Sequence, residues 1–182
     1  MHPIDYVAGG ASFLGECELL GQTVREQICD LSCELVAELE KSRLQVVERI
    51  HGDLGLWNIL WTKSGPVPID FADVGPGPAA HDLAQIALGV GGFTSPPVAL
   101  TERRRIIETL SDGYGLDGLE RESIHKHVAL VLAARRIHVS AWIASRWNDK
   151  RFQCKYPDFP AESRWRRELS WIRSELELAQ SL

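Results

Sequence analysis

The chain has 182 residues, enough for one domain with a sizeable core and too few for two ordinary ones. Its composition is that of an ordinary soluble protein; it lacks an apolar run of 18 residues that could span a membrane and a signal-peptide start, so we expect a cytoplasmic protein without a membrane partner. The net charge is −5 and basic residues are interleaved with acidic and apolar ones, so we expect no nucleic-acid partner either.

The first half of the chain reads as a short irregular segment, one helix and three strands. Residues 1–15 contain three glycines and are expected to be irregular. From about 21 to 41, apolar residues recur at three- and four-residue spacing, which predicts an amphipathic helix. Residues 44–50, 59–62 and 67–69 predict short strands, the last two joined by a hairpin turn over residues 63–66.

The second half is expected to be helical. Residues 75–78 alternate Gly and Pro, which excludes a helix and predicts a loop. Helices are then predicted over 80–90, from an N-cap at Thr101 to about 114, from 119 to about 147 and from 162 to 178, with breaks at 91–97 and 156–160. The sequence therefore predicts one mainly α domain over residues 1–182, with two or three short strands between residues 44 and 70.

The four cysteines are Cys17, Cys29, Cys33 and Cys154. Cys29 and Cys33 stand four residues apart on a predicted helix and would share a face. A metal-binding pair is conceivable there, but no His or further Cys stands at ligand spacing nearby. We expect buried, reduced thiols instead.

The chemically specific residues lie between His51 and Leu83. The order is His51-Gly52-Asp53, then Asn58, then Ile69-Asp70-Phe71. Phosphoryl transfer from Mg-ATP uses these residue types, because one carboxylate accepts the proton of the attacking hydroxyl while an Asn and a second Asp hold the metal against the triphosphate. A hairpin between Asn58 and Asp70 would bring its two ends together. We therefore expect Asp53, Asn58 and Asp70 to converge on one space of the size of Mg²⁺.

The motif departs from the protein-kinase form in two places: Gly52 replaces an Arg, and Ala72 replaces the Gly that follows Asp-Phe. With His-Gly-Asp and Ile-Asp-Phe, it resembles the choline/aminoglycoside phosphotransferase family, which has a protein-kinase-like fold. Residues 136–165 are also similar to the C-terminal helices of bacterial stress-response kinase A, a Ser/Thr phosphotransferase of the same superfamily; homoserine kinase type II is another relative. The resemblance covers about residue 20 to the end and implies a helical C-terminal lobe (α+β) with a small β-hairpin at the catalytic loop.

The resemblance also implies roles for the central motif. Asp53 would be the catalytic base that orients the acceptor hydroxyl. His51 fits better as a scaffold of the catalytic loop than as an acid or base. Asn58 and Asp70 would bind Mg²⁺, a hard cation that takes oxygen ligands, and through it ATP.

Acidic and histidine residues outside the central motif have less specific assignments. Asp82 resembles the helix-start aspartate that holds the catalytic loop from beneath in this family, although an ordinary N-cap is the alternative. Asp73 fits a second metal contact and a structural acid equally well. His125, His127 and His138 are expected to be surface or partly buried residues, with an acceptor contact left open.

Part of a complete kinase-like enzyme is missing from the sequence. No Gly-rich phosphate loop precedes His51, and neither Lys41 nor Lys63 is placed as the phosphate lysine. We therefore expect the C-terminal lobe alone, without the N-terminal ATP-clamping lobe. The first hypothesis is an ATP-dependent phosphotransferase that acts on a hydroxyl of a small molecule or a protein Ser/Thr. The second is a non-catalytic remnant or interaction domain. The acceptor, the choice of ATP or GTP and the oligomeric state stay open.

Overall fold

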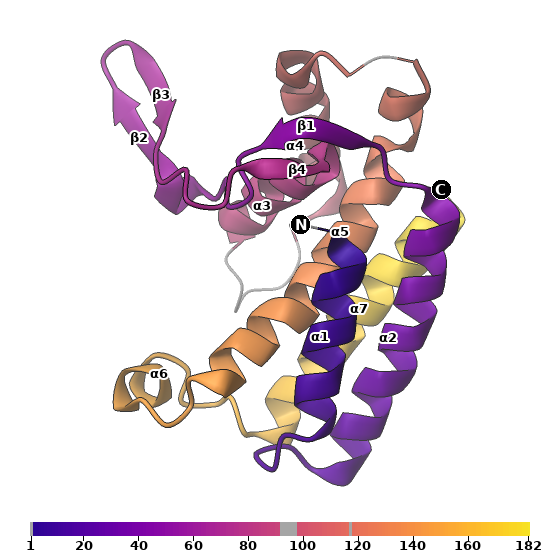
Figure 1. Ribbon diagram of the computed structural model, residues 1–182, viewed down its shortest axis with the longest axis vertical. Helices are drawn as coiled ribbons and strands as arrows, with labels where there is room; N and C mark the ends of the chain where they lie inside the picture. Colours follow the sequence, from indigo (N-terminus) through magenta and orange to yellow (C-terminus); the bar gives the residue numbers. More distant parts are fainter. Residues whose placement is uncertain (1, 92–97, 117) are drawn as a thin grey trace.

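A computed structural model describes residues 2–91, 98–116 and 118–182 (Figure 1). The α-helices of this part are α1 (Pro3–Gly15), α2 (Gln22–Ser42), α3 (Ala79–Gly91), α4 (Leu100–Tyr114), α5 (Gly118–Ser145), α6 (Lys150–Lys155) and α7 (Glu162–Ser181). The strands are β1 (Val46–Ile50), β2 (Ile59–Thr62), β3 (Gly65–Pro68) and β4 (Gly75–Pro78), and a 3₁₀ turn, η1 (Leu56–Asn58), precedes β2. The mainly helical fold with a small hairpin confirms the predicted fold class. The break predicted at 91–97 falls almost wholly outside the described residues.

Helix α5 is the centre of the helical body. It packs against α1, α3 and α7, and α2 lies alongside α1 and α7 (Figure 1). Its fully buried side chains include Val128, Leu130 and Val131, whose removal from water stabilises the fold by about 25 cal/mol per Å². By length and composition, the segment Arg121–Ser145 could also cross a membrane, contrary to the expectation from the sequence. Its most apolar window is 72% buried inside the protein, and this core position accounts for its composition.

The prediction of irregular chain over residues 1–15 is wrong, because Pro3–Gly15 forms α1. His2 caps this helix, its ring Nδ1 accepting the N–H of Ile4 at 3.3 Å, and Pro3 stands at the first turn, where it is well tolerated. Gly10 lies where α1 meets α5, and a Cβ there would come within 2.9 Å of Ile137 Cγ2. Close packing of two helices thus outweighs the low helix propensity of glycine.

The prediction of a loop over residues 75–78 is also wrong. These residues form β4, which pairs antiparallel with β1, with Val46 opposite Pro78. Both sheets of the described chain have two strands, so every strand is an edge strand, where proline can be accommodated. The predicted hairpin is confirmed: β2 pairs with β3, with Ile59 opposite Pro68, and projects from the helical body (Figure 1).

Other expectations about the helices and cysteines need smaller corrections. Helix α4 begins at Leu100 with Ala99 at its N-cap, so Thr101 is not the cap. The short helix α6 was not predicted; its cap is Asp149, whose carboxylate accepts the N–H of Arg151 at 2.9 Å. All four cysteines are free, but the expectation of burial is wrong, since Cys29, Cys33 and Cys154 are exposed and Cys17 is half-buried. The first two border a groove between α1 and α2 instead of the core.

Two buried ion pairs tie α7 to its neighbours. The Arg103 guanidinium on α4 makes two hydrogen bonds with the Glu175 carboxylate. Arg136 on α5 donates to Glu168 at 3.0 Å. Burial raises the pKa of Glu168, and the charge of Arg136 opposes this shift. Both pairs are less than a tenth exposed, so neither partner could be removed without leaving an unpaired buried charge.

Candidate functional site

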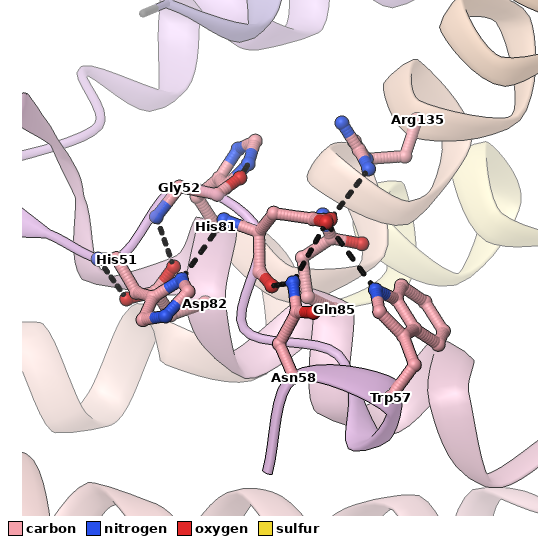
Figure 2. Close-up of polar contacts among 9 residues, drawn as sticks. His51, Gly52, Trp57, Asn58, His81, Asp82, Gln85 and Arg135 are labelled. Atoms are coloured by element: carbon pink, nitrogen blue, oxygen red, sulfur yellow. Dashed lines mark hydrogen bonds and ion pairs between the residues drawn. The ribbon is translucent and has the colours of Figure 1, made fainter. Parts of the chain in front are cut away.

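The loop between β1 and β2 is fixed from beneath by Asp82 in the first turn of α3. Its two carboxylate oxygens accept the N–H groups of His51 at 2.6 Å and Gly52 at 2.9 Å (Figure 2). Tyr114 on α4 donates its hydroxyl to the same carboxylate at 2.6 Å. Burial and the neighbouring Asp82 raise the pKa of Tyr114, so it stays a protonated donor. Asp82 is fully buried, and its hydrogen bonds set the start of the loop.

Gly52 occupies a position that no other residue could take without strain. Its φ is +84°, and a Cβ would lie 2.4 Å from the carbonyl oxygen of Asp73. The Arg that protein kinases carry at this place would therefore not fit here. The carbonyl of Gly52 accepts the Nε2–H of His81 at 2.9 Å. Burial, followed by the charge of Arg135, lowers the pKa of His81 to about 4, so this ring is neutral near pH 7.

The carboxylate of Asp53 is held by donors from three segments of the chain. Its Oδ1 accepts a hydrogen bond from Gln85 Nε2 of α3 at 2.8 Å and lies 3.5 Å from the guanidinium of Arg135 on α5. Its Oδ2 accepts from the Trp57 indole at 3.2 Å and from Asn58 Nδ2 at 3.0 Å (Figure 2). This carboxylate has one defined orientation.

His51 connects the loop to the chain that follows β3. Its Nδ1 accepts the N–H of Asp53 at 3.4 Å, so Nε2 carries the proton and donates to the carbonyl of Ile69 at 2.9 Å. Its ring also lies against that of Phe71, with centroids 4.9 Å apart. The ring thus acts as a bridge within the site.

Asn58 and Asp70 stand at the two ends of the β2–β3 hairpin. The backbone N–H of Ile69, the residue before Asp70, donates to the carbonyl of Asn58 at 2.9 Å, so the backbones of Asn58 and Ile69 lie side by side. The side-chain NH₂ of Asn58 donates hydrogen bonds to Asp53, and its amide oxygen accepts none from the described residues. Asp70 has a left-handed φ of +62°, and its exposed carboxylate makes no hydrogen bond or ion pair with any described residue.

These two side chains offer an amide oxygen and a carboxylate. That donor set fits Mg²⁺, which takes one or two protein oxygens and completes its shell with water and phosphate oxygens. A cage made by the protein alone is not seen: within residues 2–91, 98–116 and 118–182, no group of three His, Cys, Asp or Glu side chains could hold a metal. Convergence of Asp53, Asn58 and Asp70 on a single metal stays a prediction.

A cleft of about 620 Å³ opens beside Asp53. Its lining near the loop between β1 and β2 includes Trp57, Asp73 and Gln85, whereas Asp70 does not line it. Further lining residues come from α5, α6 and the residue after α6: Arg135, His138, Trp142, Lys155 and Tyr156. Burial, followed by the charge of Arg135, lowers the pKa of His138 to about 4, so its ring is neutral near pH 7. The three histidines of α5 are all half-buried, as predicted.

Sequence reasoning missed three residues that touch Asp53: Trp57, Gln85 and Arg135. Trp57 directly precedes Asn58 in the motif, so its position in the sequence could have pointed to it. Gln85 stands three positions after Asp82, so both lie on one face of α3, and this spacing could have pointed to it. Arg135 is separated from Asp53 by 82 positions and lies in the middle of an apolar helix. No local pattern singles it out.

Comparisons with known proteins show the family of the chain. The profile of the phosphotransferase enzyme family (APH) matches residues 15–125, which include the whole stretch from His51 to Asp82. The chain belongs to this phosphotransferase family. The resemblance seen in the sequence is thereby confirmed.

Similar proteins include two named stress response kinase A. That of Salmonella choleraesuis (strain SC-B67) is 30% identical over 121 residues, covering 66% of this chain and 34% of the relative. That of Escherichia coli (strain K12) is 29% identical over 138 residues, covering 74% and 38%. A serine/threonine protein kinase RdoA of Salmonella typhimurium (strain LT2) is 31% identical over 124 residues, covering 66% and 34%. The chain thus spans little more than a third of the length of these relatives.

Proposed function

We propose that this phosphotransferase-family chain carries the catalytic base and the acceptor cleft of an ATP-dependent kinase. Asp53 would accept the proton of an acceptor hydroxyl. As that oxygen forms its bond to the γ-phosphorus of ATP, the bond from phosphorus to the β–γ bridging oxygen breaks and ADP leaves. The observation that carries the proposal is the Asp53 carboxylate, fixed by four donors at the wall of a cleft of about 620 Å³.

Positioning supplies much of the rate in phosphoryl transfer, because there is little covalent chemistry for the protein to perform. The donors to Asp53 come from the loop, from α3 and from α5, so the packed helical body sets the direction of the carboxylate. His51 and Asp82 support the same loop from its other side.

Asn58 and Asp70 are proposed to hold Mg²⁺, and through it the phosphates of ATP. Support comes from the amide oxygen of Asn58 and the carboxylate of Asp70, neither of which has a hydrogen-bond partner among the described residues, and from the hydrogen bond that joins Ile69 to Asn58. When bound, the metal would neutralise charge on the phosphates.

The sequence contains no Gly-rich phosphate loop, so we expect the 182 residues alone to bind Mg-ATP weakly and to transfer phosphate very slowly. The same residues joined to an N-terminal nucleotide-binding lobe should be active. Asp73 is proposed as a structural acid, since its backbone carbonyl lies against Gly52, where a Cβ would come within 2.4 Å of it.

The test combines metal binding and turnover. Mn²⁺ replaces Mg²⁺ in an NMR titration of the 182-residue chain with ATP, and signals of Asn58 and Asp70 should broaden first. Asp70→Asn should abolish this pattern, whereas Asp112→Asn, an exposed change on α4, should keep it. Broadening elsewhere would contradict the metal assignment. Absence of turnover even in the two-lobed form would favour the alternative of a non-catalytic interaction domain.

A further inference from the structure

We propose that the amide oxygen of Gln85 accepts a hydrogen bond from the molecule that is phosphorylated. The donor would be a second group of that molecule, next to the hydroxyl that Asp53 activates. The acceptor would then be a β-amino alcohol or a vicinal diol: a serine residue with its own peptide N–H, or a small diol. This inference rests on the proposed function and assigns Gln85 as a specificity-determining residue.

The orientation of the Gln85 amide follows from its partner. Gln85 is fully buried, and its nearest partner is Oδ1 of Asp53 at 2.8 Å. An ionised carboxylate only accepts hydrogen bonds, so the NH₂ group of the amide has to face Asp53. The amide oxygen Oε1 must therefore point to the other side.

The surroundings of that oxygen carry the argument. Oε1 of Gln85 is buried and accepts no hydrogen bond from any described residue. Arg135, whose guanidinium lies 3.5 Å from the same Asp53 oxygen, makes no hydrogen bond to it. Native proteins pair the large majority of their buried side-chain polar atoms, so an unpaired carbonyl beside a proposed base calls for an explanation. Gln85 also lines the cleft beside Asp53. The proposal therefore takes the missing donor from a molecule bound in this cleft, which has to reach the buried Oε1.

The distance between the two hydrogen-bond acceptors, Oε1 of Gln85 and Oδ1 of Asp53, limits the kind of molecule that can donate to both. The oxygen and nitrogen of an amide are about 2.3 Å apart, so Oε1 lies no more than about 5 Å from Oδ1 of Asp53. Donors on adjacent carbon atoms stand about 3 Å apart and can reach both oxygens with ordinary hydrogen bonds. A phosphorylated molecule with a single isolated hydroxyl would have no donor for Oε1.

The experiment compares acceptors that differ only in the second donor, using the form in which these residues are joined to a nucleotide-binding lobe. One pair is a serine-containing peptide and its ester analogue, in which oxygen replaces the serine N–H. The other pair is 1,2-propanediol and 1-propanol, and the pair that is used faster shows which source is the acceptor. We expect kcat/KM to favour the donor-bearing member by about tenfold or more, because its absence leaves a buried acceptor unsatisfied.

Variants locate the origin of this preference. Gln85→Met keeps the length of the side chain without its hydrogen bonds. It should bring the ratio of kcat/KM between the two members of a pair close to one. Gln85→Glu keeps acceptor oxygens but loses the donor to Asp53, so kcat should fall while the preference is retained. Leu83→Met, a buried change on the same helix, should keep the wild-type ratio.

The outcomes separate the two proposals. If transfer occurs but the wild type shows no preference for the donor-bearing molecule, the role of Gln85 is overturned while the proposed function stands. The same holds if Gln85→Met keeps the preference of the wild type. If no acceptor of either kind is phosphorylated by any form, both are overturned. Should Gln85→Met fail to fold by circular dichroism, the retained preference of Gln85→Glu decides, and its loss would contradict the inference.

Discussion

Replacing Asp82 by Asn keeps the size of this buried side chain and removes one of its two acceptor oxygens. In the better orientation, the remaining oxygen takes the place of Oδ2, where it accepts from the His51 N–H and the Tyr114 hydroxyl. The new NH₂ group then faces the N–H of Gly52, and a donor meets a donor. The loop that carries the proposed base loses one of its two anchors.

The magnitude follows from these contacts. A buried N–H without a partner costs about 1–3 kcal/mol, and the two remaining hydrogen bonds lose their charge assistance, about 1 kcal/mol each. We expect Asp82→Asn to lower the free energy of unfolding by about 3–5 kcal/mol. The matched variant Tyr114→Phe removes one donor and leaves the carboxylate with two, so it should cost only about 1 kcal/mol.

Urea denaturation of the 182-residue chain, followed by tryptophan fluorescence, measures both values. The fully buried Trp165 makes the signal sensitive to loss of the core. A loss below about 1 kcal/mol for Asp82→Asn, or one no larger than that of Tyr114→Phe, would refute the argument that Asp82 holds the loop.

Gly52→Ala should destabilise the chain by at least about 2 kcal/mol in the same assay, since φ is +84° and the added Cβ would lie 2.4 Å from the Asp73 carbonyl; an unchanged midpoint would contradict this. Arg103→Met should cost about 3–5 kcal/mol by leaving Glu175 buried without a partner, and adding Glu175→Leu should recover most of it in thermal melts; equal losses in both variants would show that the charge is not the cause. The His138 ring should titrate in NMR at about 4. Because the unfolded ring binds its proton near 6.5 and the folded ring does not, the free energy of unfolding falls as pH drops from about 6.5 to about 4; a ring that titrates near 6.5 would contradict this.

Long periodic segments were predictable from the sequence, because a buried helical face imposes its spacing on many residues at once. Helices α2, α3, α5 and α7 and the β2–β3 hairpin follow from such local patterns. Helix α1 did not, since Gly9 and Gly10 read as a break until α5 is present to pack against Gly10. The strand pairing of residues 75–78 with β1 is likewise a tertiary contact with no local signal.

The candidate site divides in the same way. His51, Asp53 and Asn58 lie within eight residues, and their spacing is visible in the chain itself. Arg135 reaches Asp53 only because α5 packs behind the loop, so the sequence alone gives no reason to choose it over the other arginines. The roles of the motif residues stay predictions until turnover is measured.

Turnover of the Asp53→Asn variant tests the central proposal most directly. In the form joined to a nucleotide-binding lobe, the change keeps the size of the side chain and removes the proton acceptor, so kcat should fall by about 10²–10⁴-fold. Asp112→Asn, on the exposed face of α4, should keep the wild-type rate. If Asp53→Asn folds normally and transfers phosphate at the wild-type rate, Asp53 is not the base.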